Sequence, residues 1–141
     1  MNSGIRFGTS EWAQSLIAEI NASSEYKNAG VHWGVGFNGD VLMEFEADAI
    51  LPTTRTLLVR LQAGKCGGAE FVDAVPAPEA GFALKAPFSL WKEILERRTL
   101  AATALLTGRL TVRGDMATLL RHLPAHRALI HCAASIDTRF E

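Results

Sequence analysis

The sequence has few cysteines and no long apolar run, and each of these absences excludes a class of protein. Its two cysteines, Cys66 and Cys132, are too few for the disulfide framework of a small secreted domain. No apolar run reaches the ~20 residues of a membrane-spanning helix, and the first residues lack the apolar core of a signal peptide. We therefore expect free thiols and a cytoplasmic protein with no integral membrane segment.

An excess of charge of either sign is also missing. The chain has 14 Lys and Arg residues against 15 Asp and Glu residues, a formal net charge of −1. Because long-range attraction to a polyanion needs an excess of positive charge, the composition favours neither nucleic acid nor an anionic membrane as a partner. The length of 141 residues suits one domain, residues 1–141, that buries its core without disulfides or a metal.

Hydrophobic periodicity predicts a helix and then a hairpin in the first third of the chain. Thr9 and Ser10 are suitable N-caps, and an apolar stripe with helical spacing follows them at Trp12, Leu16, Ile17 and Ile20. The polar residues 21–30 predict a loop. Apolar residues alternate over 31–37, and Asn38-Gly39 is typical of a tight hairpin, so we expect strands on both sides of that pair.

Two further strands are predicted over residues 57–61 and 67–75, with a turn at Ala63-Gly64-Lys65 between them. The strand that follows Gly39 carries three acidic residues, Glu44, Glu46 and Asp48. Paired carboxylates can perform acid–base catalysis, but nothing flanking these three indicates a pocket that would shift a pKa. We expect a solvated sheet face.

In the stretch 82–123, short predicted strands and helices alternate, with only short connections between them. Phe82 and Leu84 have the alternation of a half-buried strand, and Pro87 suits the first turn of a helix. A small apolar helix over 100–106 ends at Gly108, and a short amphipathic strand over 109–113 follows.

Gly114 allows a tight exit from that strand, and Asp115 is placed to cap the next helix. The spacing of the apolar residues in this helix predicts that all of them face the sheet. They are Met116, Leu119, Leu120 and Leu123.

A family resemblance rests on this same stretch. Residues 106–115 read Leu-Thr-Gly-Arg-Leu-Thr-Val-Arg-Gly-Asp, an apolar helix follows, and an Ala-Pro-x-x-x-Trp helix start precedes them at Ala86. This arrangement resembles the sterol-carrier-protein (SCP2-type lipid-transfer) domain family. The resemblance implies an α+β fold with a five- to six-stranded, mainly antiparallel sheet. Helices would cover one face and enclose an apolar tunnel for a fatty acid, acyl-CoA, sterol or phospholipid, with no catalysis and no cofactor.

Eight apolar side chains are the candidate ligand contacts that the resemblance assigns to such a tunnel. They are Trp33, Phe37, Phe88, Trp91, Leu95, Leu105, Met116 and Leu120. Their spacing alone predicts only an apolar interface between sheet and helices, which an ordinary packed core would also have. Arg109 and Arg113 suit a headgroup at a tunnel mouth, although ordinary surface charge explains them better.

The residues that carry catalysis or bind metals form no convincing pattern. His122 and His126 are four residues apart, but Pro124 separates them and no glutamate base accompanies them, so we predict a solvated helix end and no metal site. His131 and Cys132 are neighbours on a predicted helix and point apart, which excludes a thiolate pair between them. We predict a non-enzymatic lipid carrier. The alternatives are a small cone-shaped hydrolase or isomerase with an apolar cavity, and an interaction module that forms a homodimer through its sheet or the 31–37 strand.

Overall fold

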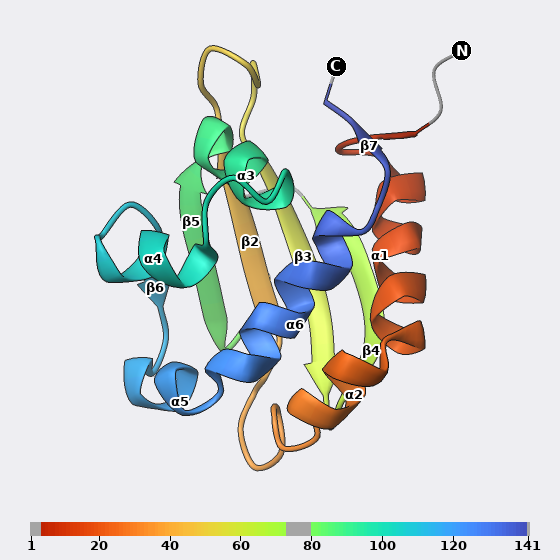
Figure 1. The fold of residues 1–141 in the computed structure, drawn as a ribbon, viewed down its shortest axis with the longest axis vertical. Helices are drawn as coiled ribbons and strands as arrows, with labels where there is room; N and C mark the ends of the chain where they lie inside the picture. The colour runs from red at the N-terminus through yellow and green to blue at the C-terminus, as the bar shows by residue number, and fades with distance from the viewer. Residues whose placement is uncertain (1–3, 73–79, 141) are drawn as a thin grey trace.

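A mixed sheet with the strand order β4-β3-β2-β5-β6 organises the fold (Figure 1). The computed structural model describes residues 4–72 and 80–140. Within these ranges the sheet has five strands: β2 (Val41–Glu46), β3 (Arg55–Gln62), β4 (Lys65–Val72), β5 (Phe82–Pro87) and β6 (Thr111–Arg113). The first three form an antiparallel meander, β5 joins β2 in parallel, and β6 pairs antiparallel with β5. This confirms the expected α+β class and a mainly antiparallel sheet.

The helices of the described residues cover one face of this sheet (Figure 1). They are α1 (Ser10–Ala22), α2 (Ser24–Ala29), α3 (Phe88–Leu95), α4 (Ala101–Leu106), α5 (Met116–Arg121) and α6 (Leu123–Ala134). In Figure 1, α6 crosses in front of the central strands and α1 lies along the β4 side. Near the chain ends, β1 (Ile5–Arg6) and β7 (Thr138–Arg139) form a separate parallel pair. None of the helices described is long and apolar enough to cross a membrane.

Local capping signals in the sequence place several of these elements. Thr9 caps α1, since its side-chain oxygen accepts a hydrogen bond from the Trp12 backbone N–H at 3.2 Å. Asp115 caps α5 in the same way, with the Ala117 N–H at 3.1 Å from its Oδ1. Pro124 lies at the start of α6, where its missing N–H costs nothing. The helix starts predicted at Thr9 and Asp115 are confirmed.

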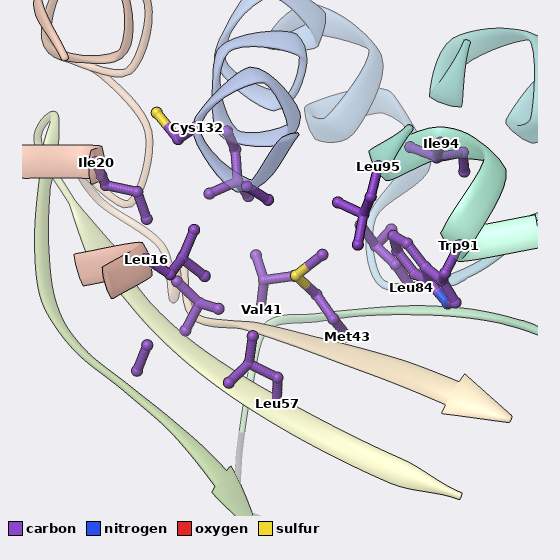
Figure 2. Packing of buried hydrophobic residues seen from close by; sticks show 14 of the residues in the cluster. Leu16, Ile20, Val41, Met43, Leu57, Leu84, Trp91, Ile94, Leu95 and Cys132 are labelled. Carbon is purple, nitrogen blue, oxygen red and sulfur yellow. The ribbon is translucent and has the colours of Figure 1, made fainter. Parts of the chain in front are cut away.

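The core lies between the sheet and the helices. Val41 and Met43 of β2 extend from the sheet toward the helices (Figure 2). Leu57 of β3 and Leu16 and Ile20 of α1 belong to the same cluster. The three tryptophans, Trp12, Trp33 and Trp91, are fully buried in the same cluster. A much smaller apolar cluster, Leu42, Leu58 and Ala83, lies on the opposite side of the sheet.

The structure contradicts the predicted strand over residues 31–37. This segment is a run of turns, in which Gly34 and Gly36 have φ angles of +80° and +82° that a strand does not allow. Trp33 anchors the loop by donating its indole N–H to the Gly39 carbonyl at 2.8 Å. No hairpin therefore forms at Asn38-Gly39. The loop expected over 21–30 is also wrong, because α2 forms there with Ser23 as its N-cap.

The orientation expected for α5 is wrong for two of its side chains. Leu119 is buried, but Met116 and Leu120 are 42% and 44% exposed and therefore do not pack against the sheet. The helix has six residues, and such a short helix buries only a narrow stripe. The strand expected over 109–113 begins at Thr111.

Other local expectations hold or need one correction. Ala63 and Gly64 form the turn between β3 and β4, both with positive φ, as a type I′ hairpin requires. Lys65, expected in the turn, already belongs to β4, so this strand starts two residues earlier than predicted. Strand β4 is described to Val72, and the predicted end at residue 75 lies outside the described residues. Asp48 is not merely a solvated carboxylate, because its Oδ2 accepts the backbone N–H of Ser89 in α3 at 2.7 Å.

Candidate ligand-binding cavity

A cavity of about 730 Å³ lies between β5, the α3–α4 connection and the helices α4, α5 and α6. Apolar side chains from five elements line it, among them Leu84 of β5, Ile94 of α3, Leu105 of α4, Leu119 of α5 and Leu129 of α6. Other apolar lining comes from Leu100, Ala101, Leu110, Leu123, Pro124 and Ile130. The volume and the apolar lining are typical of a small-molecule pocket.

The local sequence explains why these side chains converge. The cap at Asp115 sets the rotation of α5, which turns Leu119 inward, and the restart at Pro124 sets that of α6. The parallel pairing of β5 with β2 places Leu84 on the helix-covered face next to Met43. The cavity is thus lined by elements that are separate in sequence, three of which, β5, α4 and α5, have only six residues each.

Charged side chains are found at the edge of this apolar lining. Arg97 and Arg127 contribute to the cavity wall, and both are exposed to solvent. Glu25 of α2 and His131 of α6 also contribute, and the His131 Nδ1 lies 3.1 Å from the Glu25 Oε1. The cavity therefore combines an apolar interior with both cationic and anionic groups at its edge.

His126 differs from the other polar lining residues because its Nε2 atom is buried without a hydrogen-bond partner among the described residues. Its ring packs edge to face on Trp33, with the centroids 4.4 Å apart. Burial, and to a smaller extent the neighbouring His122, lower the pKa of His126 to about 4. The imidazole is therefore neutral near pH 7, and the expectation of a solvated helix end is wrong for this residue.

Of the eight candidate ligand contacts, the structure places Leu105 in the cavity wall. Four others are buried in the core, namely Trp33, Phe88, Trp91 and Leu95, and Phe37 is partly buried against it. Trp91 also donates its indole N–H to the Glu44 carbonyl at 2.9 Å, which fixes α3 to β2. Met116 and Leu120 lie on the surface of α5.

Sequence reasoning missed most of the cavity wall. Leu84, Ile94, Leu119 and Leu129 each belong to an apolar stripe that the sequence reveals, so a signal for their burial existed. Nothing in the spacing distinguishes a stripe that lines a cavity from one that fills the core. Arg109 and Arg113, considered for a headgroup, do not line the cavity, whereas Arg97 and Arg127 do.

The remaining reactive groups form no second chemical centre. Cys66 and Cys132 are free and buried, and burial raises the pKa of both thiols, so neither is an activated nucleophile. A smaller cavity of about 320 Å³ between α1, α2 and α6 is lined by Glu19, Ser23, Glu25, His131, Cys132 and others. Across residues 4–72 and 80–140, no group of three or more His, Cys, Asp or Glu side chains is arranged to hold a metal ion.

Comparison with known proteins agrees with this architecture. A profile of the SCP-2 sterol transfer family matches residues 49–122, and no curated protein matches the chain. The crystal structure of a sterol carrier protein 2 has a TM-score of 0.79 and 29% sequence identity, covering 89% of this chain and 95% of that one. A conserved hypothetical protein from Thermus thermophilus, described as possibly a sterol carrier protein, has a TM-score of 0.80 and 27% identity, covering 98% and 94%.

A more distant structure shares the fold alone. The apo form of sterol carrier protein 2 from Yarrowia lipolytica is 13% identical, with a TM-score of 0.57 over 86% of this chain and 88% of that one. The fold and the cavity thus define a small lipid-transfer domain. The chain belongs to the SCP-2 sterol transfer family.

Proposed function

We propose that this domain is a non-enzymatic carrier that holds a fatty acyl chain, a sterol or a similar apolar lipid in the cavity between β5 and α4–α6. The observation that carries the proposal is the cavity itself, since about 730 Å³ of space lined by leucine and isoleucine side chains is costly to leave in contact with water. The sterol carrier name of the related structures supports the same ligand class.

Burial of the ligand supplies the affinity. Each methylene moved from water into an apolar wall contributes ~0.8 kcal/mol, so an acyl chain of about a dozen methylenes contributes on the order of 10 kcal/mol before ordering costs. No charged anchor is needed for useful binding, and release requires only another apolar environment. Such energetics suit a carrier that exchanges its ligand.

Two measurements on the purified chain test the proposal. Native mass spectrometry, followed by organic extraction, identifies any lipid that copurifies. After delipidation, titration with a fluorescent fatty acid and with a fluorescent sterol measures uptake directly, and competition by unlabelled lipid shows that both use one site. A delipidated, folded protein that takes up neither probe would contradict the proposal.

His126 is the one observation that favours an enzyme, the cone-shaped hydrolase or isomerase, because a neutral imidazole at an apolar cavity resembles a general base. However, its buried Nε2 is covered by protein atoms, and a base must reach the proton it removes. The carrier proposal therefore predicts that no lipid-ester hydrolysis depends on His126. If the chain hydrolysed a lipid ester and His126→Gln abolished that activity, the enzyme hypothesis would replace the carrier.

The second alternative is an interaction module that forms a homodimer. The segment 31–37 is no strand and cannot extend a sheet, so a dimer would have to use another surface. Sedimentation over a range of protein concentrations distinguishes the carrier from a dimerising module, which would show an increase in mass with concentration.

A further inference from the structure

The near-zero net charge of the chain conceals a strongly basic segment. Residues 97–127 contain six of the 14 basic residues, all arginine, and one of the 15 acidic residues. The segment therefore has a formal charge of +5, whereas the whole chain has −1. It includes α4, β6 and α5, which lie together at one edge of the sheet (Figure 1).

Among the residues described, most of these arginines make no ion pair with an acidic side chain and are exposed to solvent. Arg109 pairs with Glu93 at 3.8 Å and Arg98 with Glu96 at 2.6 Å. The other four, Arg97, Arg113, Arg121 and Arg127, are exposed and make no salt bridge within the described ranges.

The acidic residue of the segment does not cancel this charge. Asp115 lies beside Arg121, but its carboxylate accepts hydrogen bonds from the Ala117 N–H and the Thr118 hydroxyl. The single carboxylate of Asp115 does not balance the four guanidinium groups that make no salt bridge in the described part of the chain, so this edge of the sheet is positively charged.

Large apolar side chains are exposed on the same segment. Leu106 at the end of α4 is 80% exposed and Leu100 just before it is 74% exposed, the two highest values among the exposed large hydrophobic residues described. Met116 and Leu120 on α5 add two more. Exposed leucine beside arginine is typical of surfaces that bind at the boundary between lipid headgroups and acyl chains.

This basic and apolar edge is continuous with the cavity. Arg97 and Leu100 belong both to the exposed surface and to the cavity wall, and Arg127 completes the wall from α6. The exposed surface and the cavity wall therefore share residues, so a partner bound at Arg97 and Leu100 lies next to the cavity. Nucleic acid would use the arginines but not the leucines, whereas a lipid bilayer uses both.

We propose that residues 97–127 form a docking surface for an anionic phospholipid bilayer, with arginines against the phosphates and Leu100 and Leu106 inserted between headgroups. The inference rests on the proposed carrier function, because docking here would let a lipid pass between bilayer and cavity with little exposure to water. Attraction by several arginines near an anionic leaflet is strong but falls with ionic strength.

Cosedimentation with vesicles tests the surface. One set contains phosphatidylcholine alone and the other an equal mixture of phosphatidylcholine and phosphatidylserine. The wild-type protein should bind the mixed vesicles far better, and added salt should weaken that binding. The double variant Arg113→Gln with Arg121→Gln should bind them about tenfold to thirtyfold more weakly, since each arginine near the surface contributes about 1 kcal/mol.

Matched controls come from the opposite edge of the sheet. Lys27→Gln with Lys65→Gln removes the same charge next to β4 and should leave vesicle binding unchanged. Leu106→Ser should weaken binding about tenfold, whereas Ile50→Ser, which removes another exposed apolar side chain in the β2–β3 loop, should not.

Uptake of the fluorescent fatty acid without vesicles separates the two proposals. None of Arg113, Arg121 and Leu106 lines the cavity, so their variants should retain uptake while losing docking. Equal binding to both vesicle types would overturn the docking surface and leave the carrier proposal intact, and so would an equal loss of vesicle binding in the arginine and the lysine double variants.

Preferential binding to the anionic vesicles without any fatty-acid uptake would instead overturn the carrier proposal alone. Absence of binding to either vesicle type would also overturn the docking surface, and it is the result expected if the partner is an acidic protein.

Discussion

Trp33 and His126 pack edge to face, with ring centroids 4.4 Å apart and an interplanar angle of 84°. Trp33 belongs to the loop over 31–37 and His126 to the first half of α6, so this contact ties the loop to the helix that borders the cavity. His122 packs on the same indole ring, with its centroid at 5.5 Å. The tryptophan therefore holds two histidines in a largely apolar setting.

This relationship predicts a loss of stability in mild acid. In the unfolded chain a histidine has its ordinary pKa of about 6.5, whereas burial lowers the pKa of His126 to about 4 in the folded protein. The unfolded state thus binds the proton more readily than the folded state. The contribution of neutral His126 to the unfolding free energy is therefore fully present above pH ~6.5 and is lost as the pH falls toward 4. The total effect is on the order of 3 kcal/mol.

Urea unfolding measured between about pH 7.5 and about pH 4.5 checks this prediction. His126→Gln should flatten the dependence, because glutamine does not titrate. His32→Gln, at an exposed site with no salt bridge within the described ranges, is the matched control and should keep the slope of the wild type. If the His126 variant had the same slope as the wild type, another group would be responsible.

A second prediction distinguishes cavity from core by adding volume. Leu105→Trp extends a side chain into the cavity, so the protein should stay folded, with its unfolding free energy within about 1 kcal/mol of wild type, and lose fatty-acid uptake. Leu57→Trp places the same ring in the packed core and should cost ~1–3 kcal/mol or more. Similar destabilisation of both variants would mean that the cavity is not open to an added side chain.

The third prediction concerns the junction between β6 and α5. Gly114 has a φ of +134°, and a Cβ added there would lie 2.5 Å from the Phe82 ring and 2.8 Å from the Gly81 carbonyl oxygen. Gly114→Val should therefore lower the unfolding free energy by at least about 3 kcal/mol. Arg113→Ala, one residue earlier and exposed, should change it by less than about 0.5 kcal/mol. Thermal and urea unfolding of the two variants compares them, and equal effects would contradict the strain at Gly114.

The fourth prediction concerns Asp48, which joins the β2–β3 loop to α3. Its Oδ2 accepts the Ser89 N–H at 2.7 Å, and its Oδ1 accepts those of Ile50 and Leu51 at 2.9 and 3.1 Å. Partial burial opposes ionisation, but these hydrogen bonds prevail and hold the pKa of Asp48 below its usual range. Asp48→Ala should cost about 1–2 kcal/mol, as the loss of a helix cap does.

Glu46→Ala is the control for Asp48. Glu46 pairs with Lys85 across 3.7 Å on the solvent side, and such exposed pairs contribute between zero and about 1 kcal/mol. Urea unfolding of both variants should therefore show the larger loss for Asp48→Ala. The reverse order would mean that the hydrogen bonds of Asp48 contribute little.

The accuracy of the sequence interpretation depended on how local the determining interactions are. The caps at Thr9 and Asp115 and the turn at Ala63-Gly64 act within a few residues, and their elements were predicted correctly. The alternation over 31–37 was misleading, because the same glycines that make the pattern adopt positive φ and turn the chain. In α2 a valid signal existed, since Ser23 precedes an acidic residue in the first turn, but the helix has only six residues.

The cavity was beyond prediction from spacing for a different reason. Its wall combines Leu84, Ile94, Leu105, Leu119 and Leu129, which come together only once β5 has paired with β2 and the helices have packed. Helical and strand periods report that a residue faces inward but not whether the space it faces is filled. The family resemblance supplied the expectation of an apolar ligand space. The amino-acid pattern by itself did not distinguish a ligand cavity from a packed core.

The brevity of the elements around the cavity has a consequence for how the molecule moves. Helices α4 and α5 have six residues each and β6 has three, whereas β3 and β4 have eight residues each and pair along most of their length. Short elements with few hydrogen bonds open at a lower free-energy cost than the rest of a protein. Amide protons of α4, β6 and α5 should thus exchange with solvent sooner than those of the meander, and a filled cavity should slow them most. In the proposed carrier, the wall of the cavity, more than the sheet, is the part whose fluctuations admit and release the ligand.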